Sequence, residues 1–154
     1  MFHYQDDSSR LLDFVRKVII ADIAINLVSG TLCVFFPRIL NSALFSERAL
    51  PWWVFLATGA GFFLFATWQI ARFIKPKGLT IGNLRFAAVL AWMPILALSA
   101  ALLSSLGDKL RTISEIFLWT ANIYMLLLGG LYWFAGVQVN QNQSSIFSDG
   151  KSGD

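Results

Sequence analysis

Long runs of apolar residues alternate with short polar stretches along this chain of 154 residues. Four of the runs are long enough to cross a bilayer, which takes about 20 helical residues. In lipid each run must form a helix, because an unpaired backbone amide or carbonyl costs several kcal/mol there. The pattern therefore predicts an all-α fold, a polytopic membrane four-helix bundle built from two helical hairpins in series. The predicted spans cover residues of about 18–36, 52–71, 86–106 and 116–137.

The polar segments between and after the spans predict the extent of the membrane domain, the tail and the connecting loops. A single membrane domain is expected over residues 1–137. The tail at 138–154 is polar and poor in apolar residues, so it is expected to be disordered and cytoplasmic. The loop at 38–50 carries apolar residues at near-helical spacing. It is either a short amphipathic helix on the membrane surface or an irregular loop, and the sequence leaves both open.

Composition agrees with a membrane protein and excludes several other classes. Charged residues make up 14% of the chain, whereas soluble domains carry about 25%. One cysteine, Cys33, and one histidine, His3, exclude an internal disulfide, a thiolate metal site and most histidine metal sites. The net charge of +3 is too small to indicate nucleic-acid binding. The sequence predicts no metal.

The distribution of basic residues predicts which side of the membrane each segment faces. The N-terminal segment, the second loop and the tail carry eight basic residues, and the other two loops carry four. Cytoplasmic segments are enriched in lysine and arginine, so both termini are expected in the cytoplasm. The four basic residues of the opposite side are Arg38, Arg48, Lys109 and Arg111.

An acidic residue interrupts the first span. Asp22, Asn26 and Ser29 follow one another at steps of four and three, so they share one face of a helix. A carboxylate facing lipid costs about 2.5–3.5 kcal/mol even on lenient scales, so this face is expected to point into protein. Asp22 lies only five residues after Lys17, about 7–8 Å along the axis. The acid is therefore expected near the cytoplasmic third of the membrane.

The second span offers polar partners for this acid. Gln69 and Arg72 lie one turn apart near its cytoplasmic end, and an Asp22–Arg72 ion pair would neutralise the charge. Three interpretations stay open: a contact that holds the helices together, a proton or ligand site, and a contact with a partner subunit. The predicted intramembrane polar cluster consists of Asp22, Asn26, Ser29, Gln69 and Arg72.

Small residues inside the other spans predict where helices approach closely. Ala57 and Gly61 in the second span lie four residues apart, and so do Ala97 and Ala101 in the third. Such small-xxx-small pairs allow close packing of membrane helices. In the fourth span Gly129 and Gly136 follow a polar residue at intervals of seven. The predicted packing seam comprises Ala57, Gly61, Ala97, Ala101, Asn122, Gly129 and Gly136.

The stretch from residue 18 to 137 resembles a group of short four-span bacterial integral membrane proteins of unassigned function, DoxX-like in outline. The features that carry the resemblance are Asp22, Ser29-Gly30, Pro37, Leu50-Pro51 and Arg72. The resemblance implies a bacterial inner (plasma) membrane setting and transfers no active-site residue.

The sequence lacks the motifs that would indicate a catalytic function. It has no phosphate-binding glycine loop, no serine–histidine or cysteine–histidine arrangement and no pair of intramembrane carboxylates, so we expect no enzyme and no catalytic residue. No cofactor is required, although lipid, quinone or pigment could lie against the six tryptophans and fourteen phenylalanines. The expected function is that of an accessory or assembly subunit of a membrane complex, or of a homo-oligomer. The alternative is a small proton-coupled transporter or exporter that uses Asp22.

Overall fold

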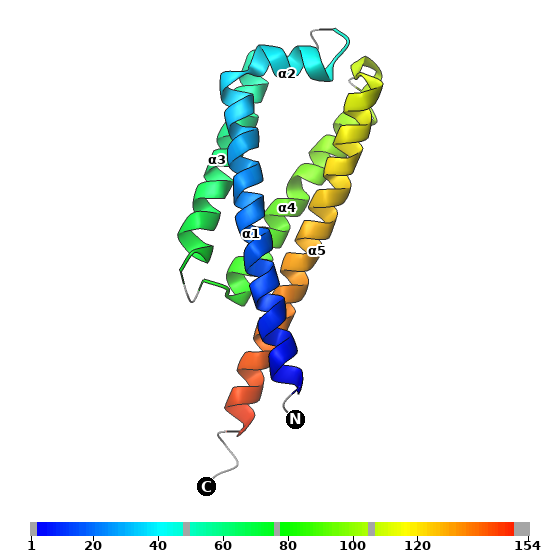
Figure 1. Cartoon of the computed structure of the whole chain (residues 1–154). Coiled ribbons are helices and arrows are strands. Elements are labelled where there is room, and N and C mark those ends of the chain that lie inside the picture. Colours follow the sequence, from blue (N-terminus) through cyan, green and yellow to red (C-terminus); the bar gives the residue numbers. More distant parts are fainter. Residues whose placement is uncertain (1–2, 48–49, 76–77, 105–106, 150–154) are drawn as a thin grey trace.

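The computed structural model of the chain is all-helical (Figure 1). It describes residues 3–47, 50–75, 78–104 and 107–149, and no strand is formed among them. In chain order the helices are α1 (His3–Phe35), α2 (Pro37–Leu44), α3 (Trp52–Phe73), α4 (Ile81–Leu102), the 3-10 turn η1 (Gly107–Lys109) and α5 (Thr112–Asp149).

Four of these helices, α1, α3, α4 and α5, are long and apolar enough to cross a membrane. This confirms the predicted number of spans and the membrane class. The ends of the helices follow from local chemistry. The residue before a proline is pushed out of the helical region, and α1 accordingly stops at Phe35, before Phe36 and Pro37. At the start of α4 the Thr80 hydroxyl accepts a hydrogen bond from the Asn83 amide, at 3.3 Å.

The loop at 38–50 is helical in its first half. Helix α2 begins at Pro37 and ends at Leu44, and it lies across one end of the molecule (Figure 1). Its far end is attached to the segment that precedes and begins α5. The Ser46 amide donates to the Lys109 carbonyl at 2.8 Å, and the Ser114 hydroxyl donates to the Ala43 carbonyl at 3.1 Å. Helix α2 therefore connects α1 to α5 across the end opposite the termini.

The four long helices pack mainly in two pairs, α1 with α3 and α4 with α5. The two pairs share a hydrophobic core at the end where both termini lie (Figure 1). Its fully buried members include Val15 and Ile19 of α1, Leu84 of α4 and Ala135 of α5. The core therefore occupies one half of the bundle's length.

The two pairs separate toward α2. In Figure 1 the α1–α3 pair and the α4–α5 pair diverge toward that end. The stripe of α5 that faces the shared core remains buried from Val139 up to Leu128. Beyond it, residues on the same stripe become accessible: Tyr124 is 38% exposed and Phe117 is 64% exposed. We call this accessible part of the α5 stripe, which consists of Phe117, Ala121 and Tyr124, the opening.

Helix α5 continues well past the predicted end of the fourth span. It runs on to Asp149, whereas the sequence predicted a disordered tail from residue 138. Residues 150–154 lie outside the described part of the chain. Neither proline nor glycine occurs between Val137 and Gly150, and such a polar stretch can extend a helix that has already been nucleated.

Candidate functional site

The carboxylate of Asp22 lies at the centre of a buried polar cluster that three helices build. Asp22 is 3% exposed and Gln69 of α3 is fully buried. The Gln69 side-chain amide Nε2 donates to Asp22 Oδ2 at 2.6 Å. This contact joins α1 to α3 and brings together two residues that the sequence placed in one cluster. Because both side chains are desolvated, each depends on the other for a hydrogen bond.

Two tyrosines of α5 complete the cluster. The Tyr132 hydroxyl, fully buried, donates to Asp22 Oδ2 at 3.0 Å. The Tyr124 hydroxyl lies 3.5 Å from Asp22 Oδ1, at the outer limit of a hydrogen bond. Gln69 Nε2 also lies 3.4 Å from the Tyr132 hydroxyl oxygen. The carboxylate therefore links α1, α3 and α5 at the level where the two helix pairs begin to separate.

The other residues of the predicted cluster lie in different positions. Asn26 is buried, but its side-chain amide donates to the backbone carbonyl of Asp22 at 2.8 Å and not to the carboxylate. Ser29 is half-buried on the same face of α1. Arg72 is exposed, and it forms no ion pair with Asp22 among the described residues. The predicted Asp22–Arg72 pair is therefore wrong.

The rotation of α3 explains this difference. Arg72 follows Gln69 by three residues, so it points about 60° away around the helix and lies about 4.5 Å further along the axis. When Gln69 faces Asp22, the guanidinium is directed past the cluster. The Tyr124 and Tyr132 hydroxyls of α5 contact Asp22 where the sequence predicted the Arg72 guanidinium.

The tyrosines were missed because of their position in the sequence. Tyr132 lies five residues before Val137, where the fourth span was expected to end, and tyrosine is common at membrane interfaces. Helix α5 extends much further, so Tyr132 belongs to the interior. The signal that could have found it is the hydroxyl itself, because a buried tyrosine usually finds a hydrogen-bond partner.

One acceptor of the cluster is left without a partner. Gln69 Oε1 is buried and has no hydrogen bond. The cluster thus combines a carboxylate, two hydroxyls and an unused amide oxygen beside the opening. It can hold the three helices together through the hydrogen bonds of Asp22.

The predicted packing seam divides into residues that contact another helix and residues that do not. Asn122 is buried, and its amide donates to the Ser99 hydroxyl of α4 at 3.1 Å. A Cβ added to Gly129 would overlap the Trp92 indole, and one added to Gly136 would lie 3.5 Å from Leu84 Cβ. Asn122, Gly129 and Gly136 therefore form the contact face of α5 toward α4.

The small-xxx-small pairs of the second and third spans were predicted to pack against neighbouring helices, and most of their residues do not. Ala57, Gly61 and Ala97 are exposed, and Ala101 is half-buried. No atom lies within 4 Å of a Cβ built on Gly61. Ala57, Gly61 and Ala97 are therefore not covered by a neighbouring helix, whereas Ala101 is partly covered.

The close approach of α1 and α3 occurs instead at a different pair of glycines. A Cβ added to Gly59 would lie 2.9 Å from the Gly30 carbonyl oxygen and 2.7 Å from Val34 Cγ2. Gly59 lies two residues from both Ala57 and Gly61, which is a rotation of about 200° around the helix. The prediction found the right kind of residue on the wrong face of α3.

The described residues contain no cluster of histidine, cysteine and acidic side chains that could hold a metal ion. Comparison with protein-family models, with curated proteins and with solved structures finds no match to this chain. The geometry of the cluster and the opening is therefore the basis for the functional argument.

Proposed function

We propose that this chain is a non-catalytic integral membrane protein that acts by association, as an accessory or assembly subunit of a membrane complex or as a homo-oligomer. The observation that carries the proposal is the opening on α5. The α5 stripe passes from the buried Leu128 to the half-buried Ala121 and the exposed Phe117. A mostly apolar helix face that its own bundle leaves accessible is suited to a further helix.

The Asp22 cluster supports the same proposal. It holds three helices together at the base of the opening through the Gln69 and Tyr132 hydrogen bonds. Because these hydrogen bonds join α1, α3 and α5, the two helix pairs stay connected at this level although they diverge toward α2. The hairpins in series, the bacterial inner membrane and the cytoplasmic position of both termini belong to this proposal. The excess of basic residues in the N-terminal segment, second loop and tail supports the cytoplasmic position of the termini.

The test is purification from native membranes in a mild detergent, followed by measurement of the mass of the particle. We expect a defined complex with fixed companion chains, or a defined multiple of the 17.2 kDa chain. The Ala121→Trp variant covers the opening with a larger side chain and should lose the association. The matched Ala57→Trp variant, at an exposed position of α3, should retain it. A lone wild-type monomer, or equal loss in both variants, would contradict the proposal.

A second candidate function is that of a small proton-coupled transporter or exporter. The observation that favours it is Tyr124, which is 38% exposed and lies 3.5 Å from Asp22 Oδ1. This side chain links the carboxylate to the opening. The candidate predicts that the Asp22→Asn protein still folds but loses proton-driven uptake of a lipophilic cation, such as tetraphenylphosphonium, into proteoliposomes.

A further inference from the structure

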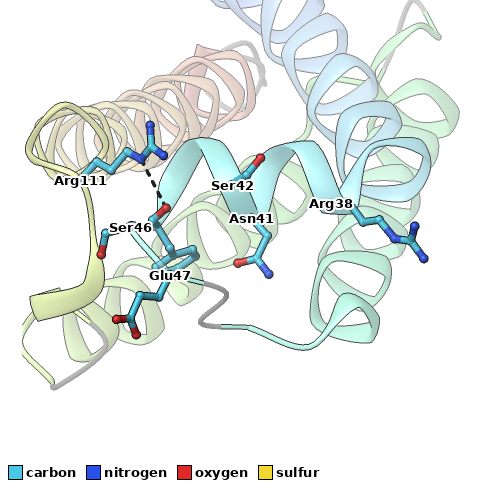
Figure 2. Close-up of a pocket in the computed structure, with 7 residues that line it drawn as sticks. Arg38, Asn41, Ser42, Ser46, Glu47 and Arg111 are labelled. Carbon is cyan, nitrogen blue, oxygen red and sulfur yellow. Dashed lines mark hydrogen bonds between the residues drawn. The ribbon is translucent and has the colours of Figure 1, made fainter.

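A second site lies at the other end of the bundle, beside α2. A cavity of about 190 Å³ is bordered there by α2, the residues that follow it and the start of α5 (Figure 2). One water molecule requires only about 15 Å³, so the cavity admits a larger polar group. Its polar lining includes Arg38, Asn41, Ser42, Glu47 and Arg111.

Asn41 supplies the first indication of a ligand. This side chain is 5% exposed and lines the cavity. Its amide nitrogen donates to the Leu50 carbonyl at 2.9 Å, but its oxygen Oδ1 has no hydrogen-bond partner. In Figure 2 this oxygen lies on the side of Asn41 that faces Glu47. A buried acceptor without a donor costs about 1–3 kcal/mol, so a hydrogen-bond donor in the cavity would be stabilised.

The charged side chains supply the second indication. Arg111 Nε donates to the Phe45 carbonyl at 3.4 Å, which fixes the base of the guanidinium and leaves its terminal nitrogens available. Arg38 lies at the other end of α2, and Glu47 lies close to Arg111 but points in a different direction (Figure 2). Arg111 and Glu47 form no ion pair with each other. The cavity thus offers one guanidinium, that of Arg111, and, separately, a carboxylate and an amide oxygen.

The position of the cavity indicates where its ligand comes from. Helix α2 crosses the end of the four long helices (Figure 1), at the level where a bilayer presents its headgroups. Phe35, Trp52 and Trp53 are 59–68% exposed at this same end, and exposed tryptophans are typical of the membrane–water interface. The ligand therefore has to be a group found at headgroup level.

We propose that this cavity binds the headgroup of a phospholipid that joins a phosphate to a primary ammonium, as in phosphatidylethanolamine. The phosphate lies against the terminal nitrogens of Arg111, because guanidinium groups bind phosphate by charge-assisted hydrogen bonds. The ammonium donates to Glu47 and to Asn41 Oδ1. A choline headgroup carries the same charges but has no N–H, so it leaves Asn41 Oδ1 unpaired.

The experiment titrates the purified full-length protein in detergent with dioctanoyl phosphatidylethanolamine and, separately, with dioctanoyl phosphatidylcholine, and follows binding by native mass spectrometry. We expect the ethanolamine lipid to bind about ten-fold more tightly, which corresponds to about 1.4 kcal/mol. Millimolar inorganic phosphate should not displace it. Equal affinity for the two lipids, or displacement by inorganic phosphate, would overturn the proposal.

Single substitutions separate the parts of the site. Glu47→Gln should weaken binding of the ethanolamine lipid more than binding of the choline lipid, whereas Arg111→Gln should weaken both. Ser42→Trp, at an exposed position that borders the cavity, should abolish binding by filling it. Lys75→Gln, an exposed base after α3, is the matched control. Wild-type binding in Ser42→Trp, or equal losses in Lys75→Gln and Arg111→Gln, would also overturn it.

Discussion

At the residue scale, the Asp22 carboxylate and its partners depend on one another. Asp22 Oδ2 accepts hydrogen bonds from both Gln69 and Tyr132. The three side chains are all buried, and each makes a hydrogen bond to another member of this small network. Removal of one member leaves the others buried without a partner, which costs more than the net gain from forming the bond.

We therefore predict that Asp22→Asn lowers the free energy of unfolding by about 1–3 kcal/mol, because an amide places a donor where two donors already converge. Asp108→Asn, at an exposed position outside the cluster, is the control and should change it by less than about 0.5 kcal/mol. Thermal unfolding in detergent provides the measurement. A double-mutant cycle with Tyr132→Phe should be non-additive. Strict additivity would show that Asp22 and Tyr132 do not act together.

The site was partly predictable for clear physical reasons. Spacing alone places Asp22 on the protein-facing side of its helix, and the cost of a charge in lipid fixes that direction. Spacing cannot say which neighbouring side chain reaches the acid, because that depends on the rotation of α3 and on the length of α5. Gln69 was therefore predicted beside Arg72, whereas Tyr124 and Tyr132 were not predicted at all.

At the scale of the element, α3 shows how the rotation of a helix decides which small residues matter. Its buried residues are Phe55, Gly59, Ala66, Gln69 and Phe73. They recur at intervals of three, four or seven, so one stripe is packed and the opposite face is left to the lipid. In a helix that is apolar all round, hydrophobicity does not reveal this stripe. The sequence does not distinguish Gly59 from Gly61, but Gly59 is buried against α1 and Gly61 is exposed.

This contrast gives a paired prediction. Gly59→Leu should lower the free energy of unfolding by about 1–3 kcal/mol, because the new side chain overlaps the Gly30 carbonyl and Val34. Gly61→Leu introduces the same side chain where no atom lies within 4 Å of the new Cβ, so its stability should stay at or above that of the wild type. Denaturation of both variants in the same detergent tests the difference. Equal destabilisation would mean that α3 is rotated from the position described here.

At the scale of the whole molecule, both termini lie at the end that holds the core, and α2 lies at the other (Figure 1). The proposed topology places the termini and the second loop in the cytoplasm and α2 outside. Four crossings follow from the sequence because the apolar runs have the length that lipid requires. The divergence of the two helix pairs does not follow, since it depends on long-range contacts between α2 and α5.

Cysteine labelling tests this topology. In a Cys33→Ser background, a cysteine introduced by Ser46→Cys near α2 should react with a membrane-impermeant maleimide in intact cells. One introduced by Lys75→Cys after α3 should react only after the membrane is opened. Both positions are exposed, so accessibility to the reagent depends on the side of the membrane. The reverse pattern would place the termini outside.

The attachment of α2 to α5 has a consequence for the time course of synthesis. The Ala43 carbonyl receives its hydrogen bond from Ser114, which lies 71 residues later in the chain. A ribosome adding about 5–20 residues per second needs roughly 4–14 s to make that stretch. During this interval α1, α2 and α3 have been made while the donor for Ala43 does not yet exist. Closure of the molecule at this end therefore waits until Ser114 has been made, and the nascent chain lacks this contact before then.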